Sequence, residues 1–562
     1  MPTFKQASFI GGMNLLVDET EIPENAYRWM INGRQRLGTP QPIKSHVLQS
    51  DLPAGLKQGV VSLGNILIAF VAGSAYYRVE GTEGWLQVSG FSMSTTAARY
   101  WSLAVPSSKF NLERRANEDG NARSALNVPV NTKVAGTPAG VLVQDGLNQP
   151  QLIQLNATAQ SQFLYARVTN NYSQWNNDGT AANSREYVPI GKFMMMQSDI
   201  LFIVAPDGHS VYRSVSGRPL DFMVNVDTAG KKLSSETVGG AASVSFAFDY
   251  DVVTALYPVN IPNAFLYGTQ SQVRVVAMNF DRTIFGEPLF DVSAKIDAGV
   301  VNEDSVLELL GDIGFVDYEN VKTFNAVRQL YVEGDNSIFS LQLSSLVDEI
   351  RQSTPRVVSW DNYALFDIDT RWGRLMAVFD TLLDVWVSLD ITDLGEVKQF
   401  ASVITEGTKS LYAINTANEL YKLFSGERAT AQIMTRAWAD DDVEAEIKLE
   451  TIRCIFDAGQ VDGTLRVREY MNNQMTQEGE RELNGKVSGV LYPVIPPVIP
   501  HTLQLTNNES LTFDQGRCGT KVQLHIQWDN DAKLHEVQIK AASATAQAAI
   551  EQQNKVLSGT QL

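Results

Sequence analysis

The chain contains 562 residues, of which 63 are acidic and 45 are basic, so its formal net charge is −18. This length predicts about two to four folding units, and a hydrophobic content of 44% excludes a globally disordered protein. No Lys/Arg-rich run occurs, which argues against a protein that grips nucleic acid by releasing counterions.

The first 58 residues are predicted to form an N-terminal arm and entry segment. The leader MPTFKQASFIGGMN shows neither a secretion pattern nor a lipidation signal, so neither is expected. Its apolar side chains must pack on this chain's own β domain or on a neighbouring subunit, and the first is favoured. These side chains are Phe4, Phe9, Ile10, Met13, Leu15 and Leu16.

A recurring hairpin pattern dominates residues 59–430. Residues 64–81, 198–217 and 407–426 share one plan: a polar turn, an apolar strand, a second turn, an alternating strand and a closing Gly. An aromatic residue followed by a basic one marks the second strand. These pairs are Tyr77-Arg78, Tyr212-Arg213 and Tyr421-Lys422. Less regular versions occur at residues 265–278, 328–343 and 373–391.

A single such hairpin cannot cover both of its faces, so it needs neighbours that radial stacking of blades supplies. The repetition therefore predicts a mainly β protein built on a β-propeller of about six blades, the exact number remaining open. Unrelated hairpins of β-sandwiches are the alternative. The longest apolar runs, such as residues 66–72, are strand-sized, so no membrane-spanning segment is expected.

Composition divides the rest of the chain. Polar, aperiodic insertions near residues 106–137 and 169–185 are predicted to be long surface loops within the propeller. Strict alternation predicts an antiparallel β domain at residues 431–541, interrupted by a proline-rich connection at 492–501. Residues 542–562 are predicted to form a polar tail, and short helices are candidates at 341–351 and 543–556.

Catalytic and metal-binding patterns are scarce. The five histidines and the cysteines Cys454 and Cys518 show no metal-ligand spacing, the thiols are expected to be reduced, and no nucleophile elbow, phosphate loop or dinucleotide fingerprint occurs. No catalytic, cofactor-binding or metal-binding residue is therefore predicted. The acidic run of Asp440, Asp441, Asp442, Glu444 and Glu446 is interpreted as a solvated strand edge rather than a cation site.

Two residue sets could serve a protein that acts on sugars. Paired carboxylates could cleave a glycan, and the candidates are Asp199, Asp207, Asp367, Asp369, Asp380 and Asp384. Acidic residues at blade turns are more often caps, so catalysis is not favoured. The tryptophans could stack on sugars, although core or interface roles are favoured. They are Trp85, Trp175, Trp372, Trp386 and Trp438, of which Trp175 is expected at a subunit contact or an exposed tip.

Residues 9–42 resemble the opening segment of tail nozzle, tail hub and packaged-DNA-stabilisation proteins of short-tailed bacteriophages. A Gly-Gly-X-Asn turn leads to an Ile-Pro-X-Asn helix start and then to Asn, Arg and Gly. The matching positions are Gly11, Gly12, Asn14, Ile22, Pro23, Asn25, Asn32, Arg36 and Gly38. Residues 141–153 and 188–222 resemble later stretches of the same families, so the resemblance covers roughly the first 220 residues.

This resemblance implies a non-enzymatic protein of the virion tail, assembled in the host cytoplasm. It implies a homo-hexameric ring below the adaptor or portal proteins, with a possible tail fibre or tailspike as a further partner. Double-stranded DNA would pass through the lumen without specific binding, and the acidic surface would keep it from adhering. Alternatives are a carbohydrate-binding or carbohydrate-cleaving propeller at a bacterial surface, and another tail or adaptor-associated structural protein.

Overall fold

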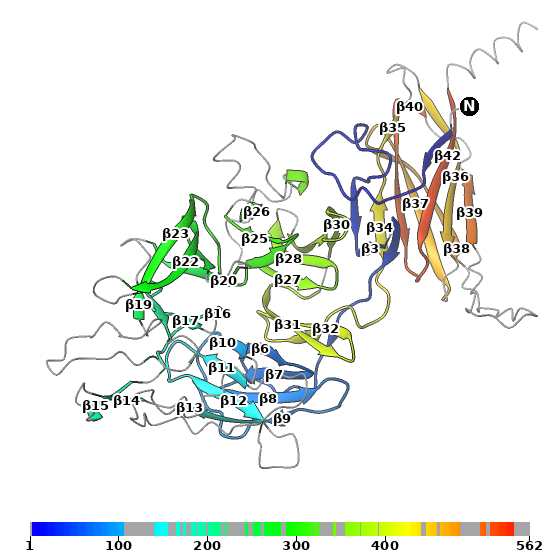
Figure 1. The fold of residues 1–562 in the computed structure, drawn as a ribbon. Helices are drawn as coiled ribbons and strands as arrows, with labels where there is room; N and C mark the ends of the chain where they lie inside the picture. The colour runs from blue at the N-terminus through cyan, green and yellow to red at the C-terminus, as the bar shows by residue number, and fades with distance from the viewer. Residues whose placement is uncertain are drawn as a thin grey trace, which may run out of the picture.

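The computed structural model is almost entirely β-sheet (Figure 1). It describes most of residues 3–543. Outside the description lie residues 1–2, 37, 106–139, 156–163, 169–171, 176–180, 187, 198–199, 215–218, 220–221, 223–241, 245–250, 260–263, 283–287, 319, 325–340, 344–354, 371–372, 392, 440–445, 458–460, 484–505, 513–517 and 544–562. In the described part, no helix is long and apolar enough to span a membrane.

Seven antiparallel sheets follow one another through the middle of the described chain, and we number them as blades in chain order. Blade 1 contains β6 (Lys57–Leu63), β7 (Ile66–Val71), β8 (Ser74–Val79) and β9 (Leu86–Gln87). Blade 2 contains β10 (Trp101–Val105), β11 (Gly140–Gln144), β12 (Gln151–Leu155) and β13 (Leu164–Val168). Blade 3 contains β16 (Met194–Gln197), β17 (Ile200–Val204), β18 (Val211–Arg213) and β19 (Ala242–Val244).

The remaining blades repeat this order. Blade 4 contains β20 (Val253–Pro258), β21 (Ala264–Thr269), β22 (Val273–Arg282) and β23 (Pro288–Ile296). Blade 5 contains β24 (Val306–Leu309), β25 (Asp312–Val316) and β26 (Val321–Thr323). Blade 6 contains β27 (Arg356–Trp360), β28 (Tyr363–Thr370), β29 (Gly373–Asp380) and β30 (Val385–Asp390). Blade 7 contains β31 (Val397–Thr405), β32 (Thr408–Asn415) and β33 (Leu420–Lys422).

The first strands of the blades form a closed ring. Each contacts the first strand of the next blade, in the order β6, β10, β16, β20, β24, β27 and β31, and β31 contacts β6 again. A closed ring of meander sheets is a β-propeller, so the predicted fold class is confirmed. The described chain has seven blades, where the sequence pattern indicated about six.

The ring is closed by a strand from the N-terminal segment. β5 (Val47–Leu48) pairs antiparallel with β33 and supplies the fourth strand of blade 7, so the two ends of the propeller meet in one sheet. The boundary predicted at residue 58 therefore separates two parts of the chain that share a blade.

The hairpins that revealed the repeat have the predicted pattern of burial. Every side chain of β7 and β17 is buried, whereas β8 and β18 alternate. The basic residue of each aromatic-basic pair is held in the fold. Arg78 lies over the Trp85 ring at 4.8 Å, Lys422 of blade 7 binds Glu80 of blade 1 at 2.5 Å, and Arg213 is buried.

Two further sheets pack face to face beside the propeller and form a sandwich (Figure 1). One contains β36 (Ile447–Asp457), β39 (Thr506–Thr512), β40 (Cys518–Gly519) and β42 (Leu534–Ser543). The other contains β34 (Ala431–Met434), β35 (Trp438–Ala439), β37 (Gly463–Met471), β38 (Gln474–Leu483) and β41 (Lys521–Trp528).

The N-terminal arm is part of this sandwich. β1 (Thr3–Gln6) pairs with β42, and β2 (Trp29–Ile31) pairs with β34. The hairpin of β3 (Gly33–Arg36) and β4 (Thr39–Pro42) then leads towards blade 7. The arm therefore runs through the sandwich before it enters the propeller.

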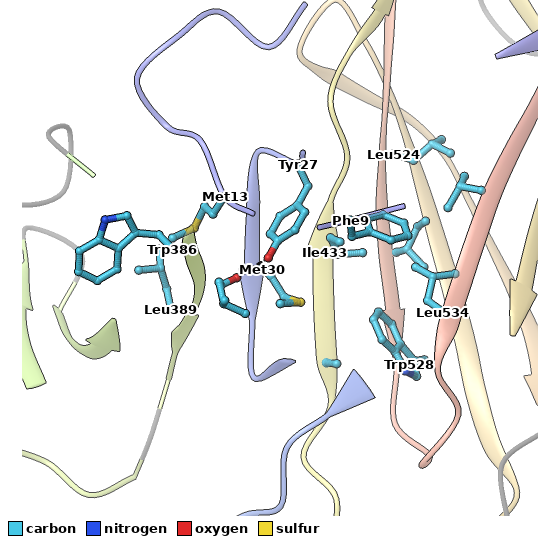
Figure 2. Packing of buried hydrophobic residues seen from close by; sticks show 14 of the residues in the cluster. Phe9, Met13, Tyr27, Met30, Trp386, Leu389, Ile433, Leu524, Trp528 and Leu534 are labelled. Atoms are coloured by element: carbon cyan, nitrogen blue, oxygen red, sulfur yellow. Dashed lines mark hydrogen bonds between the residues drawn. The ribbon is translucent and has the colours of Figure 1, made fainter. Parts of the chain in front are cut away.

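The apolar leader packs on its own chain, as favoured from the sequence. Phe9 and Met13 are fully buried, and Phe4 and Leu15 pack against the same core, while Ile10 and Leu16 remain exposed. This core is continuous from Trp386 of blade 6 to Trp528 of the sandwich (Figure 2). The propeller and the sandwich therefore share one hydrophobic core.

Three local predictions differ from the structure. Within the segment predicted as a loop near residues 169–185, β14 (Tyr172–Trp175) pairs with β15 (Ala181–Glu186). The intervening sequence Asn-Asn-Asp-Gly is typical of a hairpin turn and was the overlooked signal. The helix start at residues 22–25 is instead a turn, in which the Ala26 N–H donates to the Pro23 carbonyl at 3.0 Å.

The candidate helix at 341–351 shows one short 3-10 turn, η1 (Leu341–Leu343), and its remaining residues lie outside the description. The same holds for the insertion at 106–137, for most of the candidate blade at 328–343 and for the proline-rich connection at 492–501. Of the candidate helix at 543–556, only Ser543 is described, as the end of β42.

Candidate functional site

Charged side chains from opposite sides of the ring meet at the starting ends of the inner strands. Arg99, before blade 2, binds Asp304 and, at 2.8 Å, Glu303, both of which precede blade 5. Asp304 also lies 3.3 Å from Nε of Arg356, the first residue of blade 6. Since blades 2 and 5 stand across the ring from each other, these pairs span the propeller axis. We call Arg99, Glu303, Asp304 and Arg356 the axial cluster.

Neighbouring groups extend this connection around the ring. The Trp101 indole N–H in blade 2 donates to Glu303 at 2.9 Å. In blade 7, the Lys398 ammonium donates to the Lys57 carbonyl of blade 1 at 3.0 Å. Burial lowers the pKa of Lys398, and the positive charge of Arg99 lowers it further. Five of the seven blades are thus joined at this mouth of the tunnel.

The acids of the axial cluster act as ion-pair partners. Burial disfavours the charge on Arg99, but Asp304 and Glu303 outweigh burial and raise the pKa of Arg99 above its usual range. At Arg356 burial dominates and lowers the pKa. A carboxylate held between two guanidiniums is a poor proton acceptor, so this arrangement suits ring closure better than general acid or base chemistry.

The carboxylates considered for glycan cleavage have structural contacts. Asp367 is buried, binds Arg374 at 2.7 Å and accepts the Val397 N–H; burial raises the pKa of Asp367 although these contacts oppose the shift. Asp380 is also buried and accepts the N–H groups that follow it in a turn. Asp207 and Asp384 lie in exposed turns, Asp369 is half-buried on β28, and Asp199 lies outside the described residues.

In the described part of the chain, no group of three or more His, Cys, Asp or Glu side chains could hold a metal ion. Burial lowers the pKa of His46 and His525 to about 4, so both are neutral at pH 7. Burial raises the pKa of the Cys454 thiol to about 12, and Cys518 is exposed; both thiols are free. Of the acidic run at 440–446, only Glu446 is described, and it is exposed.

Two of the five tryptophans considered for sugar stacking are core side chains. Trp386 is fully buried between Phe366 and Phe379, with both ring-centroid distances at 5.3 Å, and Trp438 is buried in the same core. Trp85 is half-buried beneath Arg78. The side chain of Trp175 and all of Trp372 lie outside the description.

The residues that carry the family resemblance lie where the propeller meets the sandwich. Gly12 passes close to blade 6: the next N–H, of Met13, donates to the Trp386 carbonyl at 2.7 Å. The Tyr27 N–H donates back to the Gly12 carbonyl at 3.0 Å, and the Tyr27 hydroxyl donates to the Val387 carbonyl at 2.7 Å. Figure 2 shows Met13 and Tyr27 between Trp386 and the sandwich strands.

The same segment contacts blade 6 a second time. Asn32, at a φ of 54°, accepts the Ile391 N–H through its side chain. Arg34 is buried and binds Asp390 at 2.5 Å and Ser388 at 2.8 Å. We call these contacts of Gly12, Tyr27, Asn32 and Arg34 with β30 the joint.

Sequence reasoning missed the axial cluster and explained the motif glycines only as turn residues. Arg99, Asp304 and Arg356 are far apart in the chain, and only ring closure brings them together. A weak signal existed, since each charge lies within two residues of the start of a blade's first strand.

A buried carboxylate was also missed. Glu469 on β37 points inward with Val467 and Met471, is fully buried, and neither of its side-chain oxygens has a hydrogen-bond partner. Burial raises the pKa of Glu469 to about 7, with the Thr476 hydroxyl opposing the shift. The alternation of GTLRVREYM already placed this acid on the core face.

We expect Glu469 to make the protein less stable as pH rises. Folding keeps the proton on Glu469 up to about pH 7, whereas the unfolded chain loses it near pH 4.5. The free energy of unfolding should therefore fall by roughly 2 to 3 kcal/mol between these values. In urea denaturation, Glu469→Gln should remove this part of the pH dependence and be more stable than wild type at pH 8.

The matched control is Glu482→Gln, which changes an exposed carboxyl on the neighbouring strand β38. It should leave the pH dependence of unfolding unchanged. A Glu469→Gln protein that loses stability between pH 5 and pH 8 as steeply as wild type would show that this carboxyl does not remain protonated in the fold.

Comparison with known proteins gives only distant similarity. No protein-family model and no curated protein matches the chain. Among solved structures, the β-propeller domain of Cps50 (Swd1) from Myceliophteria thermophila shares 8% identity at a TM-score of 0.32, covering 67% of this chain and 99% of that one. A chain of the Mitotic Checkpoint Complex shares 9% identity at a TM-score of 0.32, covering 69% and 94%. The propeller assignment therefore depends on the closed ring of inner strands.

Proposed function

We propose that this chain is a non-enzymatic structural protein of a virion, the tail nozzle or hub of a short-tailed bacteriophage. The joint is the observation that carries the proposal. The motif positions Gly12 and Asn32 contact β30 directly, and Gly11 approaches Asn25 so closely that a Cβ would lie 2.7 Å from the Asn25 side chain. A segment similar to that of nozzle proteins thus fixes the propeller to the sandwich, as a load-resisting wall requires.

The proposed DNA path lies between subunits. The axial cluster crosses the axis of the propeller, so the tunnel of one propeller is unsuited to a duplex. Copies of the chain would stand around a common lumen as a homo-hexamer, with propellers and sandwiches as its wall. A net charge of −18 would limit adhesion of the passing DNA.

The proposed neighbours are the adaptor or portal proteins on the capsid side and a tail fibre or tailspike on the other. Location in the virion tail, after assembly in the host cytoplasm, belongs to the same proposal. A non-enzymatic role is supported by the structural contacts of Asp367 and Asp380 and by the ion pairs of the axial cluster.

Native mass spectrometry and electron microscopy of the purified protein test this proposal. We expect rings with a central opening wide enough for a DNA duplex, which is much wider than the tunnel of one propeller. Incubation with bacterial surface glycans should release no product. A monomer at every concentration that hydrolyses or retains such glycans would contradict the proposal and support the carbohydrate-directed alternative.

A further inference from the structure

A basic cleft with aromatic walls lies where blades 6 and 7 meet the β3–β4 hairpin. It encloses about 190 Å³, less than the 300 Å³ or more of typical small-molecule sites. Trp360 and Phe424 stack in its wall with ring centroids 4.6 Å apart, and the Arg34 guanidinium lies 5.2 Å from the Phe424 centroid. A space of this size suits one side chain of a partner protein better than a cofactor.

Two cations at the rim of this cleft lack acidic partners. Lys44 and Arg428 stand opposite each other in an antiparallel bridge, and both are exposed. Neither forms an ion pair in the described part of the chain, although Arg428 donates to the Pro42 carbonyl at 2.7 Å. Like charges on directly paired positions repel each other. An acidic group bound at the rim would relieve this repulsion.

The other charges of the cleft are compensated. Arg34 is paired with Asp390, and Asp361 is close enough to Lys409 to stabilise its positive charge. The unbalanced charge therefore lies at Lys44 and Arg428. In a protein with a net charge of −18, such a place suits another copy of the same acidic chain.

One end of the sandwich has the complementary chemistry. Val461 is 61% exposed in the turn before β37, beside the exposed acids Asp462 and Asp529 and the half-buried Asp531. We call these four residues the acidic knob. An apolar side chain surrounded by acids complements an aromatic cleft rimmed by cations.

The knob is held rigidly. Buried Asn530 donates to the Val461 carbonyl at 3.2 Å, and Asp529 accepts the Thr464 N–H at 2.6 Å. Gly463 allows the two turns to approach, since a Cβ there would lie 2.5 Å from Asn530. A rigid surface loses little conformational entropy when it binds.

We infer that the acidic knob of one copy binds the basic cleft of a second copy, with Val461 against Trp360 and the acids against Lys44 and Arg428. The two surfaces differ, so the contact is head-to-tail and can repeat into a closed ring. This inference deepens the proposed function and rests on its ring assembly, because it names the contact between neighbouring subunits.

Charge reversal on each side tests the contact. Lys44→Glu with Arg428→Glu should weaken assembly at least 10-fold in sedimentation or native mass spectrometry, and so should Asp462→Lys with Asp529→Lys. Mixing the two reversed proteins should restore a contact between unlike copies. The control, Lys448→Glu with Arg453→Glu, makes the same charge change on β36 and should assemble like wild type.

Crosslinking gives a readout that does not depend on the reversed proteins folding. In a Cys518→Ser background, Lys44→Cys and Val461→Cys proteins should form a disulfide-linked dimer when mixed and oxidised, and neither should do so alone. A wild-type ring that the Lys44 and Arg428 reversal leaves intact would overturn this inference alone. A wild-type chain that stays monomeric would overturn the ring of the proposed function as well.

Discussion

Replacing Gly12 by alanine should destabilise the protein by about 3 to 5 kcal/mol, through a left-handed backbone penalty of about 1–2 kcal/mol and an overpacking cost of about 1–3 kcal/mol. Gly12 has a φ of 73°, and a Cβ there would lie 2.6 Å from the Trp386 carbonyl oxygen and 2.7 Å from the Val385 Cβ. Neither can move away easily, because the Met13 N–H binds the same carbonyl at 2.7 Å. The measurement is the midpoint of urea denaturation.

Gly81→Ala is the matched control. Gly81 has a similar φ of 84°, but a Cβ there would meet no atom within 4 Å. The control should therefore carry only the backbone penalty of about 1–2 kcal/mol. Equal losses for the two variants would show that the close approach of Gly12 to blade 6 does not exist in solution.

The contrast between these glycines shows what the sequence could reveal. Both occupy turns, and turn chemistry is visible in sequence because it depends on neighbouring residues. The hairpins of the propeller were predictable for the same reason, since the apolar strand at 66–71 and the alternating strand at 74–79 are local patterns. Why Gly12 must be glycine depends on Trp386, more than 370 residues away.

Non-local pairing explains the other unpredicted features. β1 and β42 come from opposite ends of the chain, and β5 completes a blade whose other strands begin at residue 397. The cleft at Lys44 and Arg428 arises from the same kind of closure. Periodicity identified these strands or their surroundings as β, but it carries no information about which distant strand each one meets.

Removal of the Asp304 carboxylate should be the second large perturbation. Asp304 is the member of the axial cluster that touches two arginines, Arg99 and Arg356, whose side chains are only 13% and 11% exposed. Asp304→Ala leaves Arg356 without its acidic partner in the cluster and Arg99 with Glu303 alone. Loss of one partner of a buried ion pair costs about 3 to 5 kcal/mol, and we expect the lower end because Asp304 is 27% exposed.

Glu478→Ala provides the comparison, because Glu478 also bridges two arginines, Arg466 and Arg468, both at 3.1 Å. That carboxylate is 38% exposed on the edge strand β38, so its removal should cost at most about 1 kcal/mol and less at high salt. The difference between the two variants measures what burial at the propeller axis adds to an ion pair of the same composition. If thermal unfolding gave Asp304→Ala and Glu478→Ala the same small loss, water would have to fill the mouth of the tunnel, and the axial cluster would not close the ring.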